Sequence, residues 1–126
     1  MSKSFGNVLD VRDALAKYSA SDLRLFLLGI HYRRDMDLSG TDEASRRLKR
    51  MRRMAGAISD VPDGTSPLPA FDAAMSDDFD TPRAIASVER ALEKGAKEKS
   101  AEKRKQVLEA AVLSMRILGV ELLEGA

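Results

Sequence analysis

Apolar residues recur along this chain at spacings of three and four, and this periodicity restricts the possible folds more than any other feature. Two stripes show it best: Leu48, Met51, Ala55 and Ile58, and then Leu108, Ala111, Val112, Met115 and Leu118. Such spacing places side chains on one face of an α-helix, and no segment alternates as a half-buried strand would. A chain of 126 residues is also long enough to bury a core. We therefore predict an all-α fold, an up-and-down bundle of about four main helices plus short ones.

Capping residues, glycines and prolines predict where these helices begin and end. Ser19 begins a capping box, and Ser100 can cap the last long helix. Thr81 is a strong candidate N-cap, with Pro82 at the first helical position. Gly95 fits the C-terminal stop of that helix. The predicted helices span residues 11–18, 20–32, 42–59, 69–75, 82–94 and 101–118.

The helix predicted over residues 20–32 is apolar on most sides, with Leu25, Phe26 and Ile30 among its large side chains. A helix with this pattern is normally buried, so we expect it at the centre of the bundle. Its one mid-helix charge, Arg24, must then reach either solvent or a carboxylate.

The helix that carries the first apolar stripe has six cations among the eight residues 46–53, and we expect all six on its open surface, away from the stripe. Four of them recur at helical spacing and form what we call the basic flank: Arg46, Lys49, Arg50 and Arg53. A row of cations at this spacing can follow a phosphate backbone, so the flank predicts contact with RNA. The alternative is a solvated face paired with acids from elsewhere in the chain.

A second basic group, Lys103, Arg104 and Lys105, lies in the first turn of the last long helix. Positive charge is unfavourable at a helix N-terminus. This placement hints at an anionic partner.

Composition excludes several classes of site and favours a cytoplasmic protein. The chain has no cysteine, which removes disulfides and thiolate zinc sites, and its net charge of +1 indicates no partner by itself. Its apolar runs are too short to span a bilayer, so we expect a soluble protein with no membrane contact. The only histidine, His31, has no partner residues for catalysis. We interpret the acids Asp77, Asp78 and Asp80 as helix-capping residues and predict no metal site.

The first residues of the chain predict a loop rather than a helix or a strand. Lys3 lies between Ser2 and Ser4, and a Gly-Asn pair follows. A mobile lysine beside hydroxyl and backbone N–H donors suits a phosphate group. A disordered terminus is the alternative interpretation.

Separated stretches of the chain share one family resemblance. Residues 1–7, Met-Ser-Lys-Ser-Phe-Gly-Asn, resemble the KMSKS loop of class I aminoacyl-tRNA synthetases. Residues 21–28 resemble the Asp-Ala-Leu-Arg signature that opens the helical anticodon-binding domain of those enzymes, although Ser-Asp replaces the first two residues. The triplet His-Tyr-Arg at 31–33 and the segment Met-Ser-Asp-Asp-Phe-Asp-Thr-Pro at 75–82 are similar to cysteinyl-tRNA synthetases, with Asp80 where asparagine is usual.

This resemblance implies a KMSKS-like loop remnant at residues 1–9 and a helical, anticodon-binding-like domain at residues 10–126. It implies a truncated part of an enzyme that charges tRNA with cysteine. In that family the loop lysines stabilise the pyrophosphate of ATP, which makes Lys3, with Ser2 and Ser4, the expected ATP-binding residues. The expected tRNA-binding residues are Arg33, Arg34, Arg46, Lys49, Arg50 and Arg53.

The resemblance also implies what this chain would lack by itself. The Rossmann domain and the cysteine-built zinc site of the family would precede Met1, so we expect no complete catalytic set, no metal and no cofactor here. ATP and zinc belong to the full-length family. We therefore expect the chain alone to be unable to activate cysteine.

Other functions stay open at the level of sequence. The chain could act in trans by completing a separate catalytic chain, or it could be a non-catalytic protein-interaction module. A related cysteine ligase of thiol biosynthesis shares the loop motif, but the segments 31–33 and 75–82 fit the synthetase better.

Overall fold

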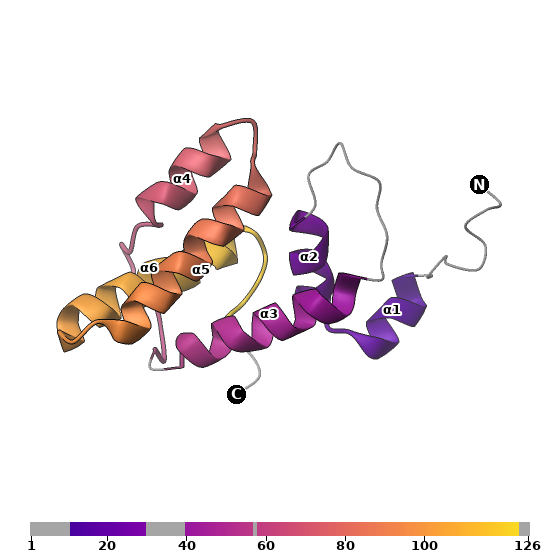
Figure 1. The fold of residues 1–126 in the computed structure, drawn as a ribbon, viewed down its shortest axis with the longest axis horizontal. Coiled ribbons are helices and arrows are strands. Elements are labelled where there is room, and N and C mark those ends of the chain that lie inside the picture. Colours follow the sequence, from indigo (N-terminus) through magenta and orange to yellow (C-terminus); the bar gives the residue numbers. More distant parts are fainter. Residues whose placement is uncertain (1–10, 30–39, 57, 124–126) are drawn as a thin grey trace.

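The computed structural model describes residues 11–29, 40–56 and 58–123, apart from the side chains of Val11 and Ala14, and Figure 1 shows its course. These residues form helices and connections without a strand, which confirms the all-α prediction. None of the helices in this part of the chain is long and apolar enough to cross a membrane. The helices are α1 (Val11–Lys17), α2 (Ala20–Leu28), α3 (Thr41–Met54), α4 (Pro69–Ser76), α5 (Thr81–Lys97) and α6 (Ala101–Ile117).

Helix α5 lies at the centre of the arrangement. It packs along α6 and α4 and also contacts α3, whereas α2 packs chiefly on α3 and α1 lies against α2 at the edge (Figure 1). The prediction that the second helix is central is therefore wrong. Helix α2 has only nine residues, and Leu27 keeps 44% of its surface exposed. The 17-residue α5 is long enough to offer separate faces to several neighbours.

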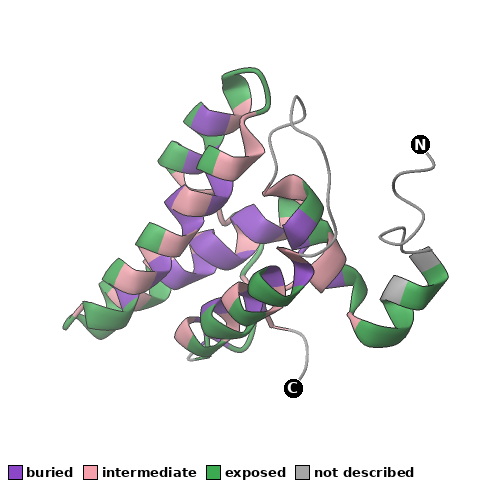
Figure 2. Cartoon of the chain, turned by 45° about the vertical axis from the view of Figure 1, so that its right-hand side comes forward, coloured by how far each residue is buried: buried purple, intermediate pink, exposed green. Residues whose placement is uncertain are grey.

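Both predicted apolar stripes are confirmed as core surfaces. Leu48 and Met51 on α3 are fully buried, as are Val112 and Met115 on α6. Phe71 of α4 is 1% exposed and completes the same cluster. Figure 2 shows the buried residues on the inner faces of the packed helices and the exposed residues facing outward.

Two predicted helix starts are confirmed by their capping hydrogen bonds. The Ser19 hydroxyl accepts from the backbone N–H of Asp22 at 3.1 Å, and the Asp22 carboxylate accepts from the Ser19 N–H at 3.1 Å. This reciprocal pair is a capping box. The Ser100 hydroxyl likewise accepts from the Lys103 N–H at 3.3 Å.

The prediction that Thr81 is the N-cap of α5 is wrong, because that position is occupied by Asp80, one of the acids interpreted as helix-capping residues. The Asp80 carboxylate accepts from the Arg83 N–H at 3.2 Å. Thr81 is the first helical residue, and its hydroxyl donates to the carbonyl of Leu28 at 2.6 Å. The threonine hydroxyl therefore joins α5 to the end of α2, a partner that lies 53 positions away in sequence.

The prediction that Gly95 ends α5 is wrong, because this glycine lies buried inside the helix. A Cβ at this position would come 2.9 Å from Cδ2 of Leu108, so the glycine permits α6 to approach closely. The helix continues to Lys97. Helix α3, by contrast, is shorter than predicted and ends at Met54 instead of Ser59. The Gly56 N–H donates to the carbonyl of Arg53 at 3.1 Å, which forms a tight turn in place of a further helical turn.

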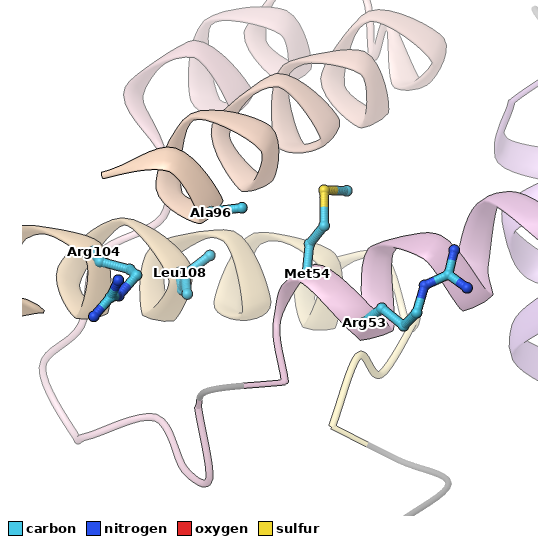
Figure 3. A pocket seen from close by; sticks show the side chains of 5 residues that line it. All are labelled: Arg53, Met54, Ala96, Arg104 and Leu108. Carbon is cyan, nitrogen blue, oxygen red and sulfur yellow. The ribbon is translucent and has the colours of Figure 1, made fainter. Parts of the chain in front are cut away.

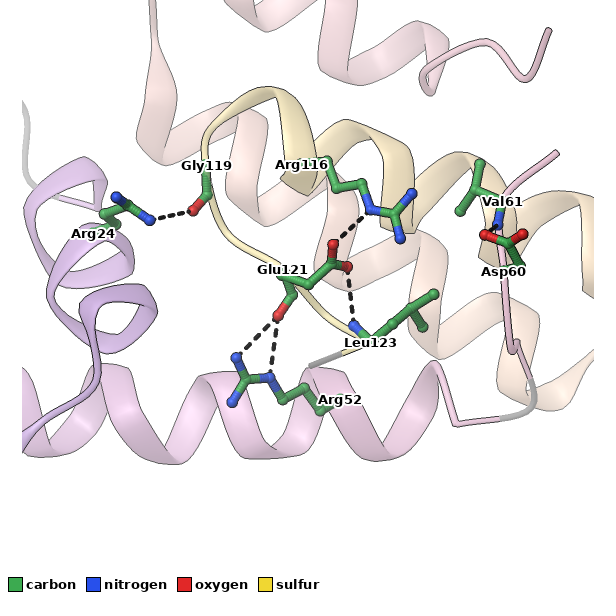
Figure 4. Close-up of polar contacts among 8 residues, drawn as sticks. All are labelled: Arg24, Arg52, Asp60, Val61, Arg116, Gly119, Glu121 and Leu123. Atoms are coloured by element: carbon green, nitrogen blue, oxygen red, sulfur yellow. Dashed lines mark hydrogen bonds and ion pairs between the residues drawn. The ribbon is translucent and has the colours of Figure 1, made fainter. Parts of the chain in front are cut away.

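The segment after α6 packs against the helices. Val120 is fully buried and Leu122 is 2% exposed. Arg24 is exposed, so it reaches solvent, one of its two predicted environments, and it also donates to the carbonyl of Gly119 at 3.0 Å (Figure 4). Arg52 also fastens this segment, with two hydrogen bonds of 3.0 and 3.2 Å to the carbonyl of Glu121.

Candidate nucleic-acid interface

The structure divides the six cations of α3 into two groups. The four residues of the basic flank are exposed, and the other two, Arg47 and Arg52, are half-buried and directed at neighbouring elements. The sequence interpretation placed all six on the open surface, which is wrong for these two. Helical spacing predicts the face that a side chain occupies, but it cannot show which face another element covers.

Arg47 forms the principal polar link between α3 and α5. Its Nη2 and Nε atoms donate to the two carboxylate oxygens of Glu89 at 2.6 and 3.1 Å. These hydrogen bonds raise the pKa of Arg47 above its usual value, although partial burial opposes the shift. Arg47 therefore stabilises the fold, and its hydrogen bonds to Glu89 keep it from binding an external anion.

Two residues of the basic flank pair with acids at the surface. Arg46 lies 2.8 Å from a carboxylate oxygen of Glu43 one turn earlier, and both side chains are largely exposed. Arg50 pairs with Glu93 of α5, again with both side chains well exposed. The alternative interpretation of the flank, a solvated face paired with acids, is thus confirmed for Arg46 and Arg50. Ion pairs of this kind contribute little, about 0–1 kcal/mol, and can be exchanged for another anion.

Lys49 and Arg53 differ from these paired residues. Both side chains are exposed, and within the described ranges neither has an ion-pair partner. They are four positions apart on one face of α3, which corresponds to a rise of about 6 Å along the helix. The uncompensated positive charge of the flank is therefore concentrated at Lys49 and Arg53.

The opposite end of α3 carries negative charge. Asp42 accepts a hydrogen bond from the Tyr18 hydroxyl at 2.5 Å, which lowers the pKa of the Asp42 carboxyl below its ordinary value. Lys17 lies 5.2 Å from the centre of the Tyr18 ring, and its pKa is raised by the contact with Tyr18 and by the charge of Asp42. With Glu43 also in the first turn, an anionic ligand is favoured only toward the C-terminal half of α3.

A hollow of about 390 Å³ opens beside that C-terminal half, lined by Arg53, Met54, Ala96, Arg104 and Leu108. Figure 3 shows Met54, Ala96 and Leu108 lying between the two arginines, which come from α3 and α6. Sequence reasoning missed this feature, because it is assembled from three helices. The only signal was the unfavourable placement of Lys103, Arg104 and Lys105 at the start of α6.

Five predicted site residues lie outside the described residues: Ser2, Lys3, Ser4, Arg33 and Arg34. His31, for which no catalytic role is predicted, lies outside them as well. The acids before α5 are engaged locally, since Asp80 caps the helix and Asp77 lies 3.2 Å from Arg83. In the ranges that the structure describes, no group of three or more His, Asp or Glu residues is arranged to hold a metal ion.

Comparisons with known proteins match two parts of the chain. Residues 1–47 match the family described as "tRNA synthetases class I (C) catalytic domain", and residues 70–123 match the DALR domain. The cysteine–tRNA ligase of Anaeromyxobacter sp. (strain K) is 41% identical over 100 residues, which cover 73% of this chain and 21% of that protein. The cysteine–tRNA ligase of Parvibaculum lavamentivorans is 37% identical over 125 residues, covering 95% of this chain and 27% of that protein.

A third relative, the cysteine–tRNA ligase of Verminephrobacter eiseniae, is 41% identical over 93 residues, or 68% of this chain and 20% of that protein. The chain therefore spans between a fifth and about a quarter of the length of the relatives it matches. The two family models together cover α1, α2, the first half of α3 and nearly all of the α4–α6 region.

Proposed function

Because the chain belongs to the cysteine–tRNA ligase family, we propose that it binds tRNA through the basic flank of α3. The flank lies just before the part of the chain that matches the DALR domain. Cysteine activation and its transfer to tRNA are the reaction of the whole ligase. This chain contributes tRNA contact to that reaction.

The observation that carries the proposal is the uncompensated charge of Lys49 and Arg53. Phosphate contacts supply most of the sequence-independent affinity for nucleic acids, and each contact made by a cation releases condensed counterions. Lys49 and Arg53 can contact phosphates without first breaking an internal ion pair. Arg46 and Arg50 must exchange Glu43 and Glu93 for phosphate, so their net contribution is smaller.

We propose further roles for the residues at the N-terminal side of the chain. Lys3, with Ser2 and Ser4, binds ATP phosphates in the complete ligase, since residues 1–47 match the catalytic-domain family. Arg33 and Arg34 extend the tRNA contact beyond the flank. In this division residues 1–9 belong to the catalytic loop and residues 10–126 form the tRNA-binding helical domain.

Fluorescence anisotropy with a labelled cysteine-accepting tRNA tests the proposal. We expect an affinity that falls steeply as salt is raised. Lys49→Gln and Arg53→Gln should each weaken binding and reduce the magnitude of the salt slope by about 1, as expected for one lost phosphate contact. Arg46→Gln and Arg50→Gln should have smaller effects.

Arg83→Gln is the matched control, because it removes the same charge at the far end of α5, where Arg83 pairs with Asp77. It should leave the affinity nearly unchanged. Absence of binding, or binding that responds neither to salt nor to the flank variants, would refute the proposal.

A further inference from the structure

The hollow beside the end of α3 combines an apolar floor with a cationic rim. Leu108 is buried and Met54 is half-buried, whereas Ala96 is exposed in the last turn of α5. Arg53 and Arg104 stand on either side of these three residues (Figure 3). A ligand that fills the hollow must therefore have a flat or compact apolar part and at least one negative charge.

Both arginines can take part in binding an anion. Arg104 donates one hydrogen bond, from Nη1 to the carbonyl of Glu98 at 3.3 Å, which holds its side chain against the α5–α6 connection. A guanidinium has five N–H donors, so this contact leaves most of them for a ligand. Arg53 has no ion-pair partner in the described part of the chain.

The surroundings of the hollow extend the positive charge of the basic flank. From Lys94 to Lys105, the end of α5 and the start of α6 carry six cations and two acids, Glu98 and Glu102. The lysines among them are exposed: Lys94, Lys97, Lys99, Lys103 and Lys105. The hollow is thus continuous with the flank through Arg53, and an RNA strand bound along α3 can reach it.

We propose that the hollow holds the base of one unstacked nucleotide from a single-stranded RNA segment, with the adjoining phosphates on Arg53 and Arg104. This inference rests on the proposed tRNA binding and adds a requirement for unpaired nucleotides. The bases of a duplex are stacked inside the helix and cannot enter such a site, whereas a splayed base can lie against apolar side chains. Methylene and methyl groups of Met54, Ala96 and Leu108 supply that surface.

Ala96 provides a test that leaves every charge in place. Ala96→Phe and the smaller Ala96→Leu fill the hollow, and the matched control Ala96→Ser leaves it open. The probes are a short labelled oligouridylate and a fully paired RNA duplex of the same length, each titrated by anisotropy at one salt concentration. Circular dichroism melting of each variant confirms that it is folded.

We expect Ala96→Phe to weaken oligouridylate binding by about tenfold, as loss of one base contact would. Ala96→Leu should weaken it less, and Ala96→Ser should bind like the unchanged chain. Duplex affinity should stay the same in all three. An unchanged affinity for oligouridylate, or an equal loss for both RNAs, would overturn the inference.

Failure of the proposed function itself has a different signature, since the unchanged chain would then bind neither RNA. An acidic peptide such as polyglutamate serves as the remaining probe. If it binds the unchanged chain, loses affinity in Ala96→Phe and displaces no RNA, the hollow is a protein-binding site and the inference is overturned.

Discussion

Glu89 on α5 accepts two hydrogen bonds from the guanidinium of Arg47 on α3, at 2.6 and 3.1 Å. Glu93, one turn later on α5, pairs with Arg50 on the same helix α3. The first pair is mostly shielded, with side chains 33% and 19% exposed, and the second is open, at 52% and 43%. Two ion pairs between the same helices thus differ both in their number of hydrogen bonds and in their contact with water.

This difference predicts unequal effects on stability. Glu89→Gln should lower the free energy of unfolding by about 1–2 kcal/mol, because it leaves a partly buried guanidinium with a weaker partner. Glu93→Gln should lower it by less than about 0.5 kcal/mol, since exposed pairs contribute little. Urea denaturation of both variants measures the two values, and equal losses would contradict the argument.

We predict that any side chain at Gly95 destabilises the packing of α6 against α5. Gly95→Ala gains about 0.5–1 kcal/mol of helix propensity, but its new Cβ would lie 2.9 Å from the side chain of Leu108, which is 1% exposed. Overpacking of this kind costs about 1–3 kcal/mol. We expect a net loss of about 1 kcal/mol in denaturation experiments and a larger loss for Gly95→Val.

A compensating change separates crowding from a backbone effect at Gly95. The double variant Gly95→Ala with Leu108→Val removes one methylene from the crowded contact. It should be less destabilised than the sum of its single variants. Exact additivity would show that the contact with Leu108 is not the cause.

The hydrogen bond from Tyr18 to Asp42 predicts a change in acid titration. In the folded chain the pKa of Asp42 lies below its ordinary value, mainly because of this hydrogen bond. The associated stability is therefore present above the unfolded-state pKa, near 3.9, and is lost as the pH falls through the lowered pKa. Tyr18→Phe should raise the pKa of Asp42 toward its ordinary value and weaken this part of the pH dependence.

Carbon-detected NMR titration of the Asp42 carboxyl measures the shift. The pKa of Lys17 should fall in the same variant, because Tyr18 is the main cause of its elevation. Asp42→Asn serves as the assignment control, since it removes the titrating group. An Asp42 pKa that does not change in Tyr18→Phe would show that the hydrogen bond is not its cause.

We predict that the 126-residue chain alone has no catalytic activity. The chain spans between a fifth and about a quarter of the cysteine–tRNA ligases it matches, so most of the sequence of the whole enzyme lies outside it. We expect no cysteine-dependent exchange between ATP and pyrophosphate. A full-length relative, such as the Parvibaculum ligase, is the positive control, and clear exchange by this chain would disprove the expectation.

Much of the fold was predictable because it depends on residues three and four apart. The stripe through Leu48 and Met51, the capping box at Ser19 and the cap at Ser100 were all predicted correctly. Each rests on the geometry of one helix and its own backbone donors. The exposure of the basic flank followed from the same periodicity, as the face opposite the apolar stripe.

Two of the errors concern residues that a distant segment contacts, whereas the early end of α3 follows from a local turn at Gly56. Thr81 is the first residue of α5 and not its cap, and its hydroxyl donates to the carbonyl of Leu28. Gly95 lies inside α5, where Leu108 of α6 packs closely against it. No local pattern contains either partner. For the same reason, the hollow formed by three helices had no counterpart in the linear sequence.

The sequence alone determined that this chain forms amphipathic helices, where four of them begin, and that one bears a row of cations. These properties depend on neighbouring residues and hold in any arrangement of the helices. Only the tertiary structure decided which cations are neutralised by acids of another helix. Arg47 meets Glu89 across 42 positions, whereas Lys49 meets no acid in the described residues. Charge pairing depends on distance in space, and packing around α5 sets that distance.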